Sequence, residues 1–362
     1  MKTLFVSATV LLWAACALPA SAEDFGKLSL LGEVVLPTGL KIAGVEFGGI
    51  SGLDYDAAND IYYAISDDRS EKAPARFYTL KIAMNEKGIN GLDIVSTRTL
   101  LDAEGKPFAT KDVDPESIRF NPATGTIYWT SEGDLNGKPA VRESRTDGTL
   151  VREFALPDAY LPNFFKTRGV RNNLSFESMT ISPDGKTLLV GTENALVQDG
   201  EAATLDAGSR SRILAFDIAS GNATAEYAYD IGPIFAKATQ APYWNDNGMS
   251  EFVAAGDDLL TVERAFAMGV GNQINFYRAS FNGATNVNGE ASLKDKQVLP
   301  LKKELLLKLG EGDFGLDIDN IESITWGPEI NGRKTLVVAS DNNFNPAQFT
   351  QFVVFQLAPS TN

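Results

Sequence analysis

The stretch Pro115-Glu116-Ser117-Ile118, followed by an apolar run that ends at Ser131-Glu132, is one of five similar copies in this chain. The other copies begin at Gly49-Ile50-Ser51-Gly52-Leu53, Phe176-Glu177-Ser178-Met179, Ser250-Glu251-Phe252 and Ile321-Glu322-Ser323-Ile324, and they end at Ser66-Asp67-Asp68, Thr192-Glu193, Val262-Glu263 and Ser340-Asp341. The spacing from the opening polar residue to the closing acid is 16 residues in three copies and 12 and 19 in the last two. Such internal repetition indicates an array of similar structural units.

Each copy contains about four short strands separated by turns rich in Gly, Asn and Asp. In the third copy the expected strands are Ser178–Ser182, Thr187–Thr192, Arg212–Ile218 and Ala225–Ile231. Four antiparallel strands per repeat, arranged in a ring, define a β-propeller blade. The sequence therefore predicts an all-β chain folded as a single β-propeller of five four-stranded blades. Six blades stay possible, because the copies are 61 to 74 residues apart and a degenerate blade could lie in a longer gap.

The last repeat has only three clear strands, whereas an alternating stretch at Lys27–Leu36 has no partner. We expect this N-terminal strand to complete the last blade and close the ring, which removes the exposed edges. A pair of β-sandwiches would also show many short strands, but it does not explain why the acidic residues recur in register.

Acidic residues recur at the same two places in the repeat. The first and second strands of a blade are antiparallel, so the start of one and the end of the other meet at one mouth of the channel. Clustered carboxylates repel one another unless a cation, a basic partner or a proton offsets their charge. Calcium accepts six to eight oxygen ligands in loose geometry and suits such a cluster. The expected catalytic carboxylates are Glu116, Glu177 and Glu322, and the expected metal ligands are Asp67, Glu132, Glu193, Glu263 and Asp341. The alternative is that each acid caps its own turn or pairs with a local arginine such as Arg69, Arg212 or Arg264.

Composition excludes several classes of chemistry. The chain has no histidine, and its one cysteine, Cys16, lies in the apolar N-terminal segment. Histidine-based hydrolysis, thiol nucleophiles and zinc sites built from His or Cys are therefore excluded. The formal net charge of −15 repels nucleic acid and anionic membranes and suits cations or cation-bridged ligands.

The N-terminus has the pattern of a secretory signal peptide. Lys2 is followed by an apolar run and by Ala20-Ser21-Ala22, a small-residue cleavage site. We expect removal of residues 1–22 to leave a monomeric propeller domain over residues 23–362 in the periplasm or outside the cell. Cleavage is favoured over lipidation at Cys16, because Trp13 stands where lipoprotein signals usually have leucine. No later stretch is apolar enough to span a membrane.

Basic residues precede the third copy, in the loop that leads to Glu177. Lys166, Arg168 and Arg171 are expected to hang over the acidic mouth, and together with Arg264 they are candidates for binding phosphate or carboxylate oxygens. Acids for a metal combined with cations for an anion suit metal-assisted hydrolysis of a phosphoester. The alternative is that these cations only neutralise neighbouring glutamates. The run Tyr243–Gly248, which precedes the fourth copy, could add an aromatic wall at this mouth.

The motifs as a set resemble a known family. They are Gly-Ile-Ser-Gly-Leu at 49–53, Asp-Pro-Glu-Ser-Ile at 114–118, Ser-Phe-Glu-Ser-Met at 175–179, Asn-Ile-Glu-Ser-Ile at 320–324 and Ala-Ser-Asp-Asn at 339–342. This set is similar to the phytase-like domain of exported bacterial proteins, described as having esterase-like activity of phytase, over about residues 48–355. The resemblance implies a propeller with recurrent Glu and Asp that carry phosphatase or phosphodiesterase chemistry. The chain departs from the motif at Ser51-Gly52 and at Ser250-Glu251.

Two functions of different classes follow. The first, which we favour, is an exported calcium-dependent hydrolase acting on a small phosphoric ester. The second is a non-catalytic propeller whose acidic mouth binds a cationic ligand or an envelope partner. A metal-dependent lactonase or carboxylic esterase is a third possibility, because acid-held calcium suits that chemistry as well.

Overall fold

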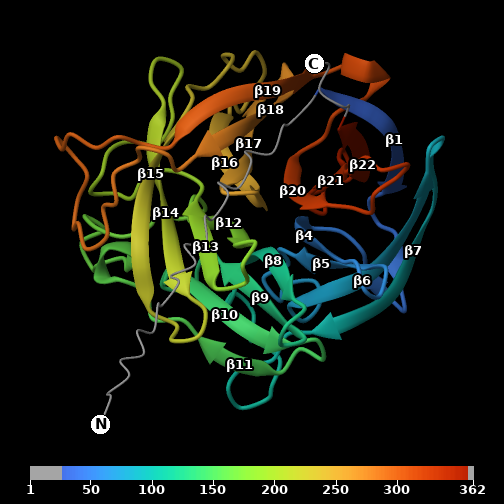
Figure 1. Ribbon diagram of the computed structural model, residues 1–362, viewed down its shortest axis with the longest axis horizontal. Helices are drawn as coiled ribbons and strands as arrows, with labels where there is room; N and C mark the ends of the chain where they lie inside the picture. The colour runs from blue at the N-terminus through green and yellow to red at the C-terminus, as the bar shows by residue number, and fades with distance from the viewer. Residues whose placement is uncertain (1–26, 358–362) are drawn as a thin grey trace, which may run out of the picture.

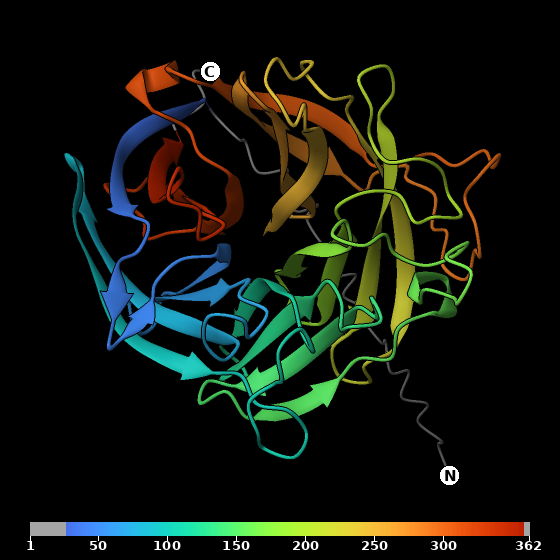
Figure 2. The same ribbon diagram turned by 180° about the vertical axis from the view of Figure 1, so that it is seen from behind.

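The computed structural model describes residues 27–357 as five β-sheets arranged around one central axis (Figure 1). Each sheet has four strands, so the predicted five-bladed propeller is confirmed and the six-bladed alternative is wrong. Residues 1–26 and 358–362 lie outside the described part, and with them the expected signal peptide and Cys16. The same ring is seen from its other face in Figure 2.

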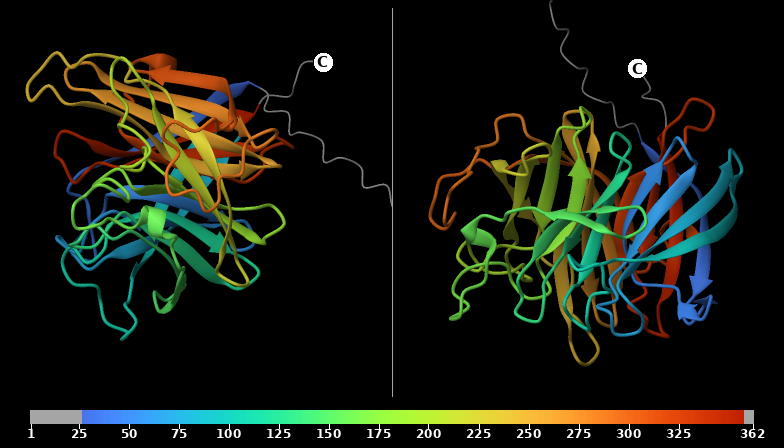
Figure 3. Two further views of the ribbon diagram at one scale, coloured as in Figure 1. Left: turned by 90° about the vertical axis from the view of Figure 1, so that its left-hand side faces the viewer. Right: turned by 90° about the horizontal axis from the view of Figure 1, so that it is seen from below.

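The strands of each blade follow one another from the axis outward. The first blade has β4 (Ile50–Asp56), β5 (Ile61–Ser66), β6 (Arg76–Asn85) and β7 (Gly88–Thr99), and the second has β8 (Pro115–Asn121), β9 (Thr126–Ser131), β10 (Ala140–Arg145) and β11 (Leu150–Glu153). The third has β12 (Phe176–Ile181), β13 (Thr187–Thr192), β14 (Ser209–Asp217) and β15 (Ala223–Ile231), and the fourth has β16 (Asn245–Ala255), β17 (Asp258–Ala267), β18 (Gly271–Ser280) and β19 (Lys302–Gly310). Seen edge-on, the strands stand across the flattened body (Figure 3).

The fifth blade joins the two ends of the described chain. It consists of β20 (Ile321–Trp326), β21 (Thr335–Ser340), β22 (Phe349–Leu357) and, as its outermost strand, β1 (Leu28–Pro37). The ladder between β1 and β22 runs from Leu28 opposite Leu357 to Pro37 opposite Phe349. The predicted closure of the ring by the N-terminal strand is therefore confirmed.

Short elements complete the chain: the ribbon of β2 (Lys41–Ile42) and β3 (Val45–Glu46), and the 3-10 helices η1 (Asp158–Tyr160) and η2 (Asp313–Gly315). Within residues 27–357 no helix has the length and apolar character needed to cross a membrane.

Apolar side chains on facing sheets hold neighbouring blades together. Between the first and second blades, Ile65 and Phe77 pack with Ile118 and Trp129, all fully buried. Burial of each large apolar side chain contributes about 1.5–3 kcal/mol relative to exposure. Because every blade shares such a cluster with a neighbour, the mouth is held by a rigid ring.

A β-bulge interrupts the ladder between the first and second strands of every blade, near the start of the innermost strand in four blades and after the paired residues Asn245–Met249 in the fourth blade. In the second blade the ladder between the first and second strands skips the pair Glu116–Ser117. In the other four blades it skips a single residue, which is Ser51, Glu177, Ser250 or Glu322. A bulged residue stands outside the ladder, and the bulge re-aims its side chain. The five opening residues of the sequence repeat are therefore the ones released from pairing at the mouth.

In the fourth blade, the pairing places Arg264 where the sequence analysis expected an acid. The residue opposite the one before the bulge is Ser66, Thr192 or Ser340 in three other blades, and each is followed by an acid of the mouth. In the fourth blade Met249 pairs with Glu263, so the next residue is Arg264. The strand register therefore places Arg264 at the position where the sequence analysis expected Glu263.

Candidate functional site

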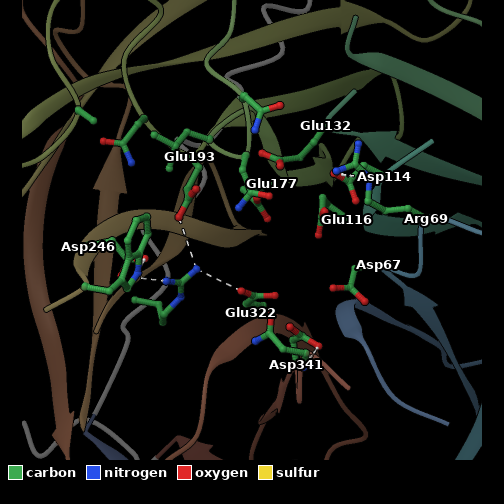
Figure 4. A pocket seen from close by; sticks show the side chains of 18 of the residues that line it. Asp67, Arg69, Asp114, Glu116, Glu132, Glu177, Glu193, Asp246, Glu322 and Asp341 are labelled. Carbon is green, nitrogen blue, oxygen red and sulfur yellow. Dashed lines mark hydrogen bonds and ion pairs between the residues drawn. The ribbon is translucent and has the colours of Figure 1, made fainter. Parts of the chain in front are cut away.

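A cavity of about 480 Å³ occupies one mouth of the propeller. Eleven carboxylates line it, against three basic side chains, Arg69, Lys72 and Arg264. The predicted acids among them are Asp67, Glu116, Glu132, Glu177, Glu193, Glu322 and Asp341, which come from four blades. Their carboxylates surround a common space (Figure 4).

The closest approach among the acids is made by two groups of three. One oxygen each from Asp114, Glu116 and Glu132 lie within 4.8 Å of one another, and the same holds for Glu132, Glu177 and Glu193. Glu132 therefore belongs to both groups. Each group contains one bulged glutamate, Glu116 or Glu177, together with Glu132, which follows a second strand, so the repeat itself contributes most of this geometry.

Burial and mutual repulsion shift the acids toward their protonated forms. Burial, followed by the charge of Glu177, raises the pKa of Glu116 well above its usual range. Burial raises the pKa of Asp114 to about 6, partly offset by Arg69, and it raises the pKa of Glu132 to about 7 with the charge of Asp114 as the next cause. Burial, followed by the charge of Glu322, raises the pKa of Asp67 well above its usual range, and burial, followed by the charge of Asp67, does the same for the pKa of Asp341. Carboxylates of this kind stabilise a bound cation strongly, because the cation removes the repulsion.

Arg264 neutralises only part of this charge. Its Nη1 lies 3.2 Å from Asp246, and its Nη2 lies 3.1 Å from Glu322 and 3.5 Å from Glu193. Glu193 and Glu322 therefore pair with an arginine, but with one distant in sequence and not with the local arginine that the alternative expected. No basic side chain within residues 27–357 forms an ion pair with Glu132, which belongs to both groups, or with Glu116 and Glu177, the bulged glutamate of each group.

Two oxygen atoms at the cavity lack a hydrogen-bond donor within residues 27–357. They are Oδ1 of Asp67 and Oδ1 of Asn247, both shielded from solvent. Gly49, whose φ of +65° favours glycine, leaves room for Asp67, because a Cβ there would overlap its carboxylate. Unpaired buried acceptors beside repelling carboxylates fit a hard cation that binds oxygen, and among such cations Ca²⁺ tolerates the irregular arrangement best.

A buried ion pair lies on the propeller axis, outside the lining of the cavity. Arg119 and Glu251 lie 3.0 Å apart, and neither side chain is exposed by more than 2%. Arg119 donates to the carbonyl oxygens of Leu53, Phe252 and Ile324, and Glu251 accepts from the Ser117 hydroxyl and from the Met179 N–H. All five innermost strands thus converge on this pair. This pair occupies the axis between the innermost strands, and the carboxylate-lined cavity at the mouth, which we call the cup, lies at one end of that axis.

Several predicted residues lie away from the cup. Glu263 is buried within the fourth blade, where it accepts from Tyr229 and pairs with Lys303. Lys166 and Arg168 are exposed and do not line the cavity, although Asn172, Asn173 and Leu174 of the same loop do. Arg171 donates to the carbonyl oxygens of Ala195 and Gly200 and thereby fixes loops together. Of the four cations expected at the mouth, only Arg264 is there.

Other lining residues were not singled out for chemistry in the sequence. Arg69 follows Asp67-Asp68 directly, and Lys72 lies three residues further on. Their position just after the second strand of the first blade is the sequence feature that could have identified them. Asp246 and Asn247 come from the run before the fourth blade that was expected to offer an aromatic wall; its Trp244 does line the cavity. The strand register decides which side chains of that run face the cavity, and the sequence alone does not give this register.

A five-bladed propeller with a cup of carboxylates at one mouth is the class that the fold and site define. The chain belongs to the phytase-like family described as esterase-like activity of phytase, whose model matches residues 45–344. No curated protein matches the chain.

Solved structures resemble the chain only distantly. The tail fibre of Staphylococcus aureus phage P68 is 13% identical with a TM-score of 0.43, covering 92% of this chain and 53% of that one, so the chain spans about half its length. A thermostable family-43 glycoside hydrolase is 14% identical with a TM-score of 0.49, covering 86% of this chain and 90% of that one. Hydrazine synthase of Kuenenia stuttgartiensis is 12% identical with a TM-score of 0.38, covering 84% and 79%. At these levels the structural matches carry no argument about function.

Proposed function

We propose that this protein is an exported, calcium-dependent hydrolase of phosphoric esters, with its site in the carboxylate cup. The observation that carries the proposal is the pair of carboxylate groups that share Glu132, each with three oxygens within 4.8 Å. Membership of the phytase-like family supports ester hydrolysis as the reaction class.

The chain's own residues divide the work at the cup. Asp67, Glu116, Glu132, Glu177 and Glu193 would hold the cation, with Asp341 and the Asn247 amide oxygen as further ligands. When bound, Ca²⁺ supplies positive charge that polarises the ester and lowers the pKa of water. Glu116, Glu177 and Glu322 all line the cavity, so the scissile ester is expected at the level of these bulged glutamates.

Cations at the rim suit the phosphate. Arg69 and Lys72 line the cup, and the Nε of Arg264 has no hydrogen-bond partner among the described residues. These three replace Lys166, Arg168 and Arg171 in the role of anion-binding residues, because they face the cavity. A guanidinium presents a planar fork that matches phosphate oxygens.

Glu322 is the carboxylate best placed to orient water. The Ser51 hydroxyl at 3.2 Å, the Asn320 amide at 3.0 Å and Arg264 at 3.1 Å all donate to it. A carboxylate held by three donors keeps one orientation, which a proton acceptor needs. Water would attack phosphorus as Glu322 takes one of its protons, the bond between phosphorus and the ester oxygen would break, and Glu322 would pass that proton to the leaving oxygen to give an alcohol.

Export is part of the same proposal. Calcium concentrations outside the cytoplasm suit a site of this kind, and the described chain contains no cysteine that oxidation would affect. Intact-mass measurement of the protein recovered from the periplasm or medium should give a chain that begins at Glu23. A mass that retains residues 1–22 or a lipid on Cys16 would contradict this step.

The activity is tested with protein freed of metal by chelation and then supplied with Ca²⁺. We expect calcium-dependent hydrolysis of p-nitrophenyl phosphate or bis-p-nitrophenyl phosphate. Glu132→Gln should lower kcat by about 10²-fold or more, because one residue of both carboxylate groups loses its charge. Glu86→Gln, on the exposed turn between β6 and β7, is the matched control and should keep full activity.

The outcomes separate the three candidate functions. Calcium-dependent ester hydrolysis that persists in a folded Glu132→Gln variant would contradict the proposal. Hydrolysis of lactones or carboxylic esters alone would favour the esterase reading. Calcium binding without turnover on any ester would favour a binding propeller.

A further inference from the structure

A groove of about 700 Å³ opens off the cup between the fourth and fifth blades. Six residues line both the groove and the cup, so the two cavities adjoin: Asn173, Trp244, Asp246, Arg264, Glu322 and Asn343. The groove is lined by five carboxylates and by Arg264 as its one basic side chain among the described residues. Arg264 already contacts three acids, so the excess of carboxylates along the groove favours a cation over an anion.

The outer end of the groove contains a hydrogen-bond acceptor that has no donor among the described residues. The backbone N–H of Asn272 donates to Glu311 at 3.2 Å, and its side-chain amide donates to the Ile318 carbonyl oxygen at 3.1 Å. Oδ1 of Asn272 is left without a partner, although the residue is only 9% exposed. An unpaired buried acceptor of this kind costs about 1–3 kcal/mol unless a ligand or water donates to it.

Two exposed carboxylates flank this amide. Asp317 is close enough to Glu311 for the two carboxyl groups to interact, and burial together with that neighbour raises the pKa of Glu311. Neither acid forms an ion pair with any residue from 27 to 357. The Glu311 carboxylate lies against Gly271. It has room there because Gly271 has no side chain, and a Cβ at this position would overlap the carboxylate.

The chemistry of these three groups selects the ligand. An ammonium group carries three N–H donors and no acceptor, which complements two carboxylates and one amide oxygen. Calcium would require six to eight oxygens, more than the three groups supply with ordinary coordination. The walls add apolar surface from Phe266 and Met268, and Trp244 is 58% exposed where the groove meets the cup. Aromatic faces also attract organic cations.

We propose that Asn272, Glu311 and Asp317 bind the ammonium group of a substrate whose phosphate lies in the cup. The substrate class is then a phosphoric ester of an amino alcohol, with its alkyl chain passing Trp244. The assignment of the phosphate rests on the proposed function, whereas ammonium binding in the groove stands on its own observations.

The first experiment measures ammonium binding without any reaction. Saturation-transfer NMR with calcium-loaded protein would compare n-butylammonium with n-butanol as a neutral probe. We expect a signal for the amine that Asp317→Asn and Glu311→Gln each weaken about tenfold in affinity, because a charged hydrogen bond is lost. Asp257→Asn, in the turn between β16 and β17 at the other end of the same blade, should leave binding unchanged.

The second experiment measures specificity. Hydrolysis of phosphoethanolamine is compared with that of 2-hydroxyethyl phosphate, which replaces the ammonium with a hydroxyl. Asp317→Asn should lower kcat/KM for the amine ester about tenfold and leave the neutral ester unchanged.

The two experiments fail in different ways. Equal binding of amine and alcohol, or amine binding that survives in both variants, would overturn the ammonium site. Loss of one bound calcium in Asp317→Asn, measured by calorimetry, would also overturn it in favour of a metal site. Absence of all hydrolysis with intact amine binding would refute the proposed function and leave the ammonium site standing.

Discussion

At the scale of single residues, Gly248 leaves room for one of the proposed metal ligands. It lies opposite Arg264 in the ladder, and a Cβ at this position would overlap the carboxylate of Glu193. Gly248→Ala should push Glu193 away from Glu132 and Glu177 and lower calcium affinity about tenfold, as misplaced ligands do. Isothermal titration with calcium measures the effect. Gly91→Ala on β7, where nothing lies within 4 Å, is the control, and equal affinities in both variants would contradict the prediction.

The ion pair on the axis supports a second prediction at this scale. Arg119→Leu would leave Glu251 buried without its charge partner, which typically costs about 3–5 kcal/mol. Urea denaturation of the calcium-free protein should show this loss in the free energy of unfolding. Lys138→Ala, which removes an exposed partner of Glu153 at 3.1 Å, should cost less than about 1 kcal/mol. If the two variants lose the same stability, the axial pair does not hold the five blades together as described.

At the scale of secondary-structure elements, β1 offers a matched pair of neighbouring positions. Val34 packs against the cluster shared by the first and fifth blades, whereas Val35 is 45% exposed on the other face of the strand. Val34→Asp should lower the free energy of unfolding by about 1–3 kcal/mol, and Val35→Asp should change it by less than about 0.5 kcal/mol. Thermal and urea unfolding would compare the two. Similar losses at both positions would mean that β1 does not close the ring through its inner face.

The strands and their repetition were predictable from the sequence because local patterns determine them. Alternation and turn residues located the blades, and the unpaired N-terminal stretch indicated the closure. Strand register was less accessible. Glu263 and Arg264 both follow an apolar run, and only the bulge at Ser250 determines which of them faces the mouth.

Long-range contacts account for the other differences. Arg171 turns away from the cup because carbonyl oxygens of a distant loop accept from it, and no local pattern encodes those partners. Arg119 and Glu251 are 132 residues apart and meet only when the ring has formed. The ammonium-binding groups likewise come from β18, the loop after β19 and the loop before β20, so their proximity is a property of the assembled blade.

At the scale of the whole molecule, the cup makes stability depend on pH. Glu132 has a pKa of about 7 in the folded state against 4.5 for an ordinary glutamate, and Asp114 has a pKa of about 6 against 3.8. The folded state therefore binds more protons than the unfolded state between about pH 4 and 7, and stability falls as pH rises through this range.

The prediction is that calcium-free protein melts at a higher temperature at pH 5 than at pH 8. Calcium should raise the melting temperature more at pH 8, where the carboxylates are ionised and no proton competes. Scanning calorimetry at both pH values, with and without calcium, provides the measurement. Glu132→Gln should flatten the dependence, and a calcium-free protein that is more stable at pH 8 would contradict the electrostatic account.

The bulges at the mouth have an evolutionary consequence. Because Ser51, Glu116, Glu177, Ser250 and Glu322 stand outside the ladder, each can be exchanged without breaking the hydrogen bonds that hold its blade. Two of these five positions already carry serine in place of glutamate. Mutation can therefore alter the charge of the cup one blade at a time while the scaffold is inherited unchanged, so lineages that share this fold are free to diverge in the ions and esters they accept.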